Sequence, residues 1–110
     1  MHQRIDKDKD YNVKILNVSI KFYLPRVEGY LEVIRKLSSE YSGMSLIEFD
    51  GYFEKKFEPV KYVRVEVHTS KINKKALIKF ANTIRKTLKQ KSLAVEYNNH
   101  LILIEEKSDE

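Results

Sequence analysis

Apolar and polar residues alternate with a period of two in two segments of the chain. The apolar positions of the first segment are Leu16, Val18, Ile20, Phe22 and Leu24. The second segment, over residues 60–69, places Val63, Val65 and Val67 on one side and polar or aromatic residues on the other. This period is typical of a β-strand with one buried and one exposed face. We therefore predict a sheet that is covered on one side only.

Two other segments carry apolar residues at helical spacing. The apolar positions of the first are Val27, Tyr30, Leu31, Ile34, Leu37 and Tyr41. The second segment begins near Asn73, a favourable N-cap residue, and its apolar positions are Leu77, Phe80, Ala81, Ile84 and Leu88. Each set forms a stripe along one side of a helix, so both helices are expected to pack against the sheet.

The remaining segments complete the order of elements. A strand is expected over about 44–53, and a polar turn over 54–59 leads into the next strand. Near the C-terminus, Asn98-Asn99 separates two apolar runs and favours a tight hairpin, because Asn tolerates positive φ. The predicted order is βαββαβ with the last strand doubled back as a hairpin. This is an α+β ferredoxin-like sandwich, with two helices on one face of an antiparallel sheet.

Length and composition set limits on the class of protein. We expect a polar tail over residues 1–10, a single domain over 11–105 and an acidic tail over 106–110. The chain has no Cys, which excludes a disulfide framework and a thiolate metal site. No apolar run is long enough to span a membrane and no secretory signal is visible. We expect a cytoplasmic protein without a cofactor and without a membrane partner.

The C-terminal half carries a short family resemblance. From Gly51 through the strand over 62–69 and the second helix to the segment 90–93, Gln-Lys-Ser-Leu, the chain resembles small ferredoxin-like bacterial and archaeal proteins of unassigned function. In those proteins the second helix ends in Gln-x-Ser and an aliphatic strand follows. Tyr52 stands here where they usually carry Trp. The resemblance implies the fold and a dimer, and it supplies no active site.

The second helix carries most of the surplus positive charge. The net charge is +5, and no Asp or Glu occurs between Ser70 and Val95. The residues that could contact phosphates are Lys75, Lys79, Arg85, Lys86, Lys89 and Lys91. Such contacts are independent of base sequence and weaken with salt. The alternative is an ordinary solvated helix face, since Lys favours helices and keeps a surface soluble.

The polar side of the two alternating strands is a second candidate surface. It gathers Lys21, Tyr23, Tyr62 and Arg64, the aromatic and cationic groups with which proteins bind single-stranded RNA. However, the third strand lacks the Gly that an RNA-recognition module requires. The alternative is that this open face pairs with a second copy of the chain. We therefore expect a homodimer, with nucleic acid as a further candidate partner.

Carboxylates on neighbouring strands form a third candidate. Glu48 and Asp50 alternate in the second strand, and Glu66 and His68 alternate in the third. If these four side chains gather, they could hold Mg²⁺ or Mn²⁺, as in a phosphodiesterase. Cross-strand ion pairs with neighbouring cations are the alternative explanation.

No pairing of a nucleophile with a base and no Gly-rich phosphate loop is visible in the sequence. We therefore predict a small basic, non-enzymatic binding or assembly protein, with the Lys-rich helix as a candidate nucleic-acid-binding surface. The alternative is a metal-dependent nuclease or phosphodiesterase that uses the acidic residues of the sheet.

Overall fold

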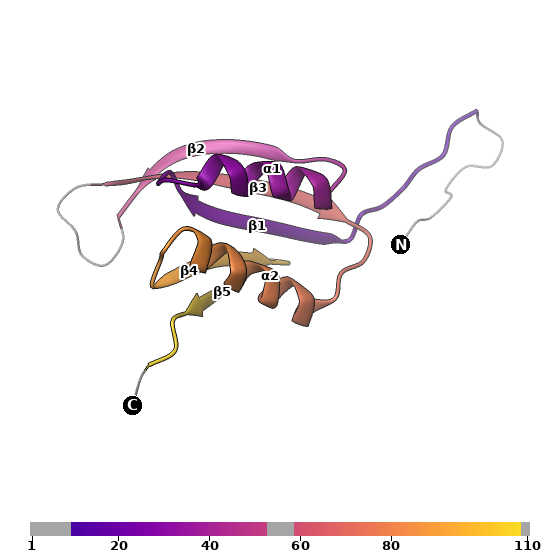
Figure 1. The fold of residues 1–110 in the computed structure, drawn as a ribbon. Helices are drawn as coiled ribbons and strands as arrows, with labels where there is room; N and C mark the ends of the chain where they lie inside the picture. Colours follow the sequence, from indigo (N-terminus) through magenta and orange to yellow (C-terminus); the bar gives the residue numbers. More distant parts are fainter. Residues whose placement is uncertain (1–9, 53–58, 109–110) are drawn as a thin grey trace.

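The computed structural model describes residues 10–52 and 59–108, and Figure 1 shows their arrangement. The elements of the described chain are β1 (Val18–Pro25), α1 (Tyr30–Glu40), β2 (Ser45–Gly51), β3 (Val60–Thr69), α2 (Lys74–Thr87), β4 (Ser92–Tyr97) and β5 (His100–Glu105). The tails over 1–9 and 109–110 and nearly all of the predicted turn over 54–59 lie outside the described residues. The predicted order of elements is confirmed.

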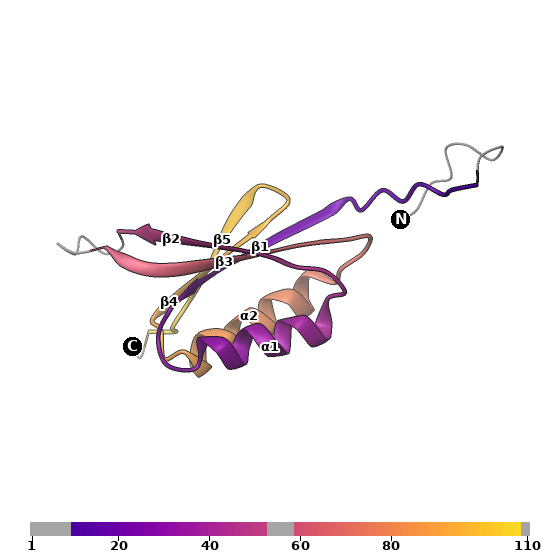
Figure 2. The same cartoon turned by 90° about the horizontal axis from the view of Figure 1, so that it is seen from above.

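The strands form one antiparallel sheet in the order β2-β3-β1-β4-β5. β1 and β3 pair over the full length of β1, from Val18 opposite Thr69 to Pro25 opposite Tyr62. The sheet differs from a four-stranded ferredoxin-like sheet in the strand β5, which is added beyond β4. Figure 2 shows that α1 and α2 lie together on one side of the sheet. The prediction of an α+β sandwich with one covered face is confirmed.

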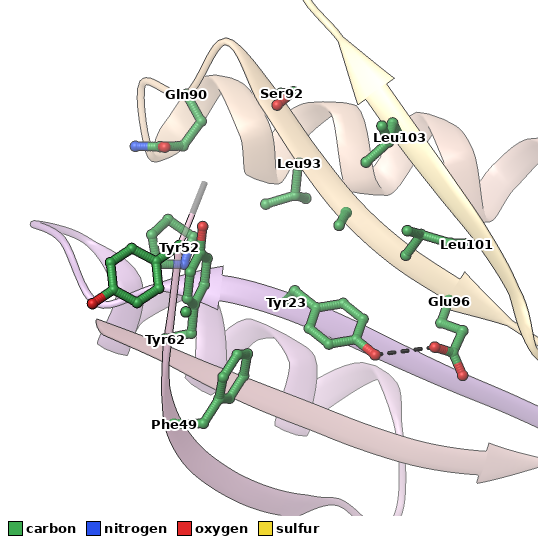
Figure 3. A pocket seen from close by; sticks show the side chains of 13 residues that line it. Tyr23, Phe49, Tyr52, Tyr62, Gln90, Ser92, Leu93, Glu96, Leu101 and Leu103 are labelled. Carbon is green, nitrogen blue, oxygen red and sulfur yellow. Dashed lines mark hydrogen bonds between the residues drawn. The ribbon is translucent and has the colours of Figure 1, made fainter. Parts of the chain in front are cut away.

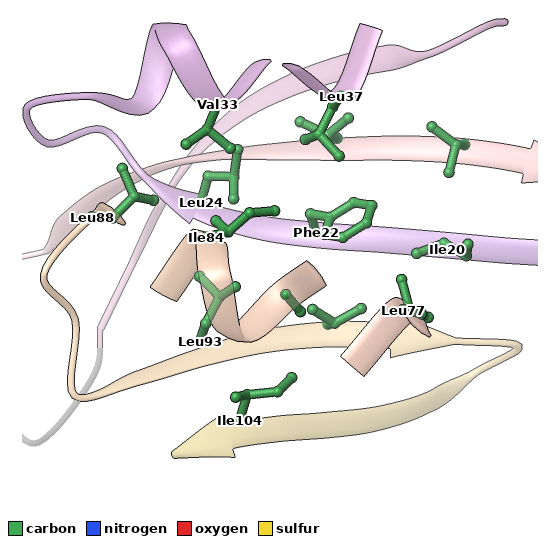
Figure 4. Packing of buried hydrophobic residues seen from close by; sticks show 14 of the residues in the cluster. Ile20, Phe22, Leu24, Val33, Leu37, Leu77, Ile84, Leu88, Leu93 and Ile104 are labelled. Atoms are coloured by element: carbon green, nitrogen blue, oxygen red, sulfur yellow. The ribbon is translucent and has the colours of Figure 1, made fainter. Parts of the chain in front are cut away.

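The hydrophobic core lies between this sheet and the two helices (Figure 4). Ile20, Phe22 and Leu24 of β1 are completely buried and pack in one cluster with Leu37 of α1 and Ile84 of α2. The side chains between them along β1 are only partly buried and point to the opposite face. Burial of large apolar side chains is the main source of stability in a small domain.

The predicted start of the helix is confirmed for α2 but not for α1. In α2, the Asn73 side chain accepts a hydrogen bond from the backbone N–H of Ala76 at 3.0 Å, so the predicted N-cap is confirmed. In α1, the N-cap is Gly29 with φ 95°, a conformation that Gly adopts without strain. Val27 therefore precedes the helix and is 37% exposed. None of the described helices has the length and apolar character needed to cross a membrane.

Candidate functional site: a pocket on the open face of the sheet

The strand registers align the side chains of the open face in three rows across the sheet. The aromatic row consists of Phe49, Tyr62 and Pro25. The middle row consists of Ile47, Arg64, Tyr23, Ala94 and Leu103. The charged row consists of Ser45, Glu66, Lys21, Glu96 and Leu101. The surface therefore changes from aromatic to charged along the strand direction.

A pocket of about 470 Å³ lies over these rows, and Figure 3 shows its lining. The rings of Phe49 and Tyr62 are stacked, with centroids 5.3 Å apart, and Tyr23 meets Phe49 edge-on at 6.1 Å. Leu101 and Leu103 of β5 lie on the other side of the pocket. Pockets for small organic ligands have volumes of roughly 300–1,000 Å³ and mostly apolar walls. The dimensions and the lining therefore suit a small, largely apolar ligand.

Among the described residues that line this pocket, Glu96 is the charged one. Its Oε1 accepts a hydrogen bond from the hydroxyl of Tyr23 at 3.0 Å, and its Oε2 lies 3.2 Å from Nζ of Lys21. Burial acts to raise the pKa of this carboxyl, but the hydrogen bonds from Lys21 and Tyr23 and the positive charges of Lys21 and Arg64 hold the pKa below its ordinary value. The pocket therefore holds a fixed negative charge at neutral pH.

Tyr23 complements this carboxylate as a hydrogen-bond donor. Burial, and then the hydrogen bond to Glu96, raise the pKa of the Tyr23 hydroxyl above its ordinary value. The hydroxyl therefore keeps its proton at neutral pH and continues to donate to Glu96. This hydrogen bond joins β1, which carries Tyr23, to β4, which carries Glu96. It also fixes the position of the Tyr23 ring in the pocket wall.

Arg64 and Glu66 form a second charged pair beside the pocket. They alternate on β3, so both side chains lie on the open face, and Nε of Arg64 is 2.6 Å from Oε2 of Glu66. Their side chains are 30% and 19% exposed. With Lys21 and Glu96 they make a group of two positive and two negative charges at one end of the site.

The connection between α2 and β4 closes the opposite end of the pocket, where Gln90 and Ser92 contribute to the lining. This connection is held by Arg85, which is 7% exposed. Its Nε donates to Oδ1 of Asn82, and its Nη1 donates to the backbone carbonyl of Gln90, each at 3.0 Å. Arg85 is thus separate from the exposed Lys side chains with which the sequence grouped it.

The other residues of the predicted basic surface are exposed, in agreement with their positions on the helical pattern. They are Lys75, Lys79 and Lys86 on α2 and Lys89 and Lys91 after it. None of these five residues lines the pocket. The predicted sheet-face residues differ in this respect, since Tyr23 and Tyr62 line the pocket and Lys21 and Arg64 flank Tyr23 in the rows defined above.

The predicted acidic cluster does not form. Glu48 lies opposite Val63, a core residue, so Glu48 and Asp50 are on the face of β2 that points toward the helix layer. Glu66 and His68 are on the open face of β3. The sequence assigned the alternation of β2 to the wrong side of the sheet. Among the described residues, no group of three or more His, Asp or Glu side chains could hold a metal ion.

Sequence reasoning missed Phe49 and Glu96, which are central to the pocket. The alternation of Leu93 and Val95 with Ala94 and Glu96 contained the signal for Glu96, since it places the carboxylate on the open face. β2 gave no such signal, because apolar residues occur on both of its faces.

Comparisons with known proteins give one structural match. No family model matches the chain, and a search of curated proteins finds no match. Among solved structures, the chain is similar to a phage SAM lyase in complex with S-methyl-5′-thioadenosine. The TM-score is 0.61 at 15% identity, and the match covers 94% of this chain and 100% of that one. The likeness is therefore one of fold over nearly the whole chain.

This match overturns our functional prediction. We expected a non-enzymatic binding or assembly protein with nucleic acid as a candidate ligand, whereas the protein that shares the fold is an enzyme with a nucleoside-like molecule bound. The alternative of a metal-dependent nuclease has no support either, because its four residues lie on two faces of the sheet. The predicted homodimer is not tested by these observations and stays a prediction.

Proposed function

We propose that this protein is a lyase that acts on S-adenosylmethionine and releases S-methyl-5′-thioadenosine. The observation that carries the proposal is the pocket on the open face, in which aromatic rings and one ionised carboxylate lie together. The fold shared with a SAM lyase supports it. A sulfonium nucleoside has matching properties, namely a flat base for the aromatic rings and a positive charge for the carboxylate.

Each part of such a ligand has a complementary group in the pocket. The adenine ring packs against the aromatic rings of Phe49 and Tyr62, as bases do on protein aromatic side chains. The sulfonium lies beside Tyr23 and Glu96, where the ring face and the carboxylate both attract a cation. Ala94, between Tyr23 and Leu103 in the middle row, leaves room for the ligand at this point.

The products of the reaction define the bond that breaks. S-methyl-5′-thioadenosine is S-adenosylmethionine without the aminobutyrate group, so the bond between the sulfonium sulfur and the γ-carbon is cleaved. The bonding electrons stay on sulfur, which becomes a neutral thioether. The γ-carbon completes its valence within the aminobutyrate group, either by bonding to its own carboxylate oxygen or by loss of a proton from the neighbouring carbon, and no water is added.

The role of the protein in this step is to bind and orient the sulfonium. Glu96 attracts the positive charge, and Lys21 and Tyr23 fix the carboxylate in place. Phe49, Leu101 and Leu103 line the same pocket with apolar side chains. A less polar environment favours a step in which the charge on sulfur disappears.

The test is to incubate the purified protein with S-adenosylmethionine and to quantify S-methyl-5′-thioadenosine by chromatography. We expect product above the level of a protein-free incubation, which corrects for spontaneous decay. Glu96→Gln removes the negative charge and should lower kcat/KM by about tenfold or more, a loss of about 1.4 kcal/mol in transition-state binding.

Lys79→Gln is the matched control, because it also removes one charge but lies exposed on α2, in the helix layer on the other side of the sheet. It should leave the rate unchanged. Product no higher than in the protein-free sample, from a folded wild-type protein, would refute the proposed reaction. An unchanged rate in Glu96→Gln would refute the assigned role of Glu96.

A further inference from the structure

The pocket has a direction, and the charged group of side chains lies beyond only one of its ends. Gln90 and Ser92 close the aromatic end, and the middle and charged rows follow at the other end. Along this direction the lining changes from Phe49 and Tyr62 to Tyr23 and Glu96 (Figure 3). A ligand with its base at the aromatic end therefore extends its other end toward the charges.

The side chain next to Tyr23 on β3 is Arg64, its partner in the strand register. Glu66 follows two residues later on the same face and pairs with Arg64 at 2.6 Å. Neighbouring strands are about 4.8 Å apart, a distance that the chain from the sulfur through two methylenes to the α-carboxylate and α-ammonium groups of S-adenosylmethionine can cover. Arg64 and Glu66 are therefore within reach of the amino acid end of a ligand whose sulfur lies beside Tyr23.

We propose that Arg64 and Glu66 form the subsite for the amino acid end of the substrate, with Arg64 binding the α-carboxylate and Glu66 the α-ammonium group. This inference rests on the proposed function. Arg64 suits the carboxylate because a guanidinium binds it through two parallel hydrogen bonds. Lys21 is less suited, since a single ammonium group cannot form those two parallel hydrogen bonds.

The ion pair between Arg64 and Glu66 makes this subsite complementary in charge to a zwitterion. Arg64 and Glu66 already place opposite charges side by side on a strand of the sheet, and both side chains are partly buried. A bound amino acid group exchanges the single ion pair within the protein for two ion pairs with the ligand. Molecules that lack the whole amino acid end leave Arg64 paired with Glu66 and gain nothing there, so the subsite selects ligands by their amino acid end.

Three stable adenosine thioethers test the subsite by calorimetric titration. They are S-methyl-5′-thioadenosine, which lacks the amino acid end, S-adenosylhomocysteine, which carries it, and decarboxylated S-adenosylhomocysteine, which carries only the amine. We expect wild-type protein to bind S-adenosylhomocysteine about tenfold more tightly than its decarboxylated form. Arg64→Met should abolish this difference and change the affinity for S-methyl-5′-thioadenosine by less than about twofold.

Two further variants keep the result interpretable. Arg64→Lys retains the charge and the strand packing but not the paired hydrogen bonds, so it should give an intermediate loss even if Arg64→Met fails to fold. Arg35→Met removes an Arg that is also paired with a Glu, Glu32, but on α1 in the helix layer. It should bind all three ligands as wild type does.

The outcomes separate this inference from the proposed function. If wild-type protein does not bind S-methyl-5′-thioadenosine, the proposed function is refuted and the subsite with it. If that ligand binds but S-adenosylhomocysteine binds no better than its decarboxylated form, only the subsite is refuted. The same conclusion follows if the discrimination persists in both Arg64 variants.

Discussion

Tyr23, Lys21 and Glu96 show how single side chains on this sheet combine structural and chemical roles. The carboxylate of Glu96 connects β4 to β1 through the hydroxyl of Tyr23 and the Nζ of Lys21. The same carboxylate faces the pocket and supplies its negative charge. Its protonation therefore affects the stability of the sheet as well as the binding of a cationic ligand.

The stability effect of Glu96 has a defined pH dependence. Its pKa is lower in the folded protein than in the unfolded chain, so ionised Glu96 stabilises the fold above its unfolded pKa. This contribution disappears as the pH falls through the lowered folded value. We expect Glu96→Gln to be less stable than wild type by about 1 kcal/mol at pH 7, and we expect the difference to shrink in acid.

Urea unfolding of both proteins at neutral and at acidic pH measures this difference directly. Groups away from Glu96 titrate alike in the two proteins, so their effects cancel, and Tyr23 keeps its proton throughout this pH range. A difference in unfolding free energy that is the same at every pH would contradict the assigned pKa shift.

At the scale of elements, the hairpin between β4 and β5 is joined to the centre of the sheet by its turn. Asn98 and Asn99 both have positive φ, 46° and 71°. The side-chain Oδ1 of Asn98 accepts a hydrogen bond from the backbone N–H of Ser19 at 2.8 Å, and the backbone N–H of Asn98 donates to the carbonyl of Ser19 at 2.9 Å. The turn thus fixes the start of β1 relative to β4.

Two substitutions separate the contributions of the backbone and the side chain of Asn98. Asn98→Ala removes the acceptor for Ser19 and strains a residue with positive φ, so it should destabilise the protein by about 1–3 kcal/mol. Asn98→Gly also removes the acceptor but relieves the strain, so its loss should be smaller. Urea midpoints give the order, and a larger loss for Asn98→Gly than for Asn98→Ala would contradict this account.

The elements differ in how well the sequence predicts them. The alternation in β1 and β3, the N-cap Asn73 and the turn at Asn98-Asn99 depend on neighbouring residues alone, and the predictions made from them hold. Which residues of β2 lie on the open face could not be predicted in this way. The edge strand carries apolar residues on both faces, such as Leu46 and Ile47, which are 51% and 40% exposed. Only the pairing with β3 determines which residues share the open face.

The pocket was harder to predict than the fold for the same physical reason. Tyr23 and Tyr62 were correctly assigned to the open face, but no pocket was predicted there. Phe49 and Glu96 reach them from strands that are distant in the sequence, through registers that local patterns do not determine. A site composed of isolated residues from several strands has no motif of its own.

At the scale of the whole molecule, the helix layer and the open face of the sheet have different roles. The helix layer covers the core and carries the exposed Lys75, Lys79 and Lys86, and the open face carries the pocket. Large apolar side chains of the pocket lining remain exposed, since Tyr52, Leu101 and Leu103 are 69%, 60% and 50% exposed. Grouped apolar exposure of this kind is typical of a surface that contacts another protein.

We therefore still predict a homodimer that associates through this side of the sheet. Light scattering at micromolar concentration should give a mass of about twice the 13.1 kDa of one chain. Leu101→Glu should shift the mass toward that of a single chain, whereas Leu31→Glu, at a 57% exposed position on α1, should not. A single-chain mass at every concentration tested would rule the dimer out.

The period of two in β1 has a consequence for how this protein can change during evolution. Ile20, Phe22 and Leu24 belong to the core, and the intervening Lys21 and Tyr23 belong to the open face. Substitutions at the intervening positions can alter ligand preference while the core keeps its packing. Loss or gain of a single residue within β1 would exchange the two sets, bury Lys21 and expose Phe22. Replacements, rather than insertions or deletions, are therefore the route by which new specificities can arise on this strand.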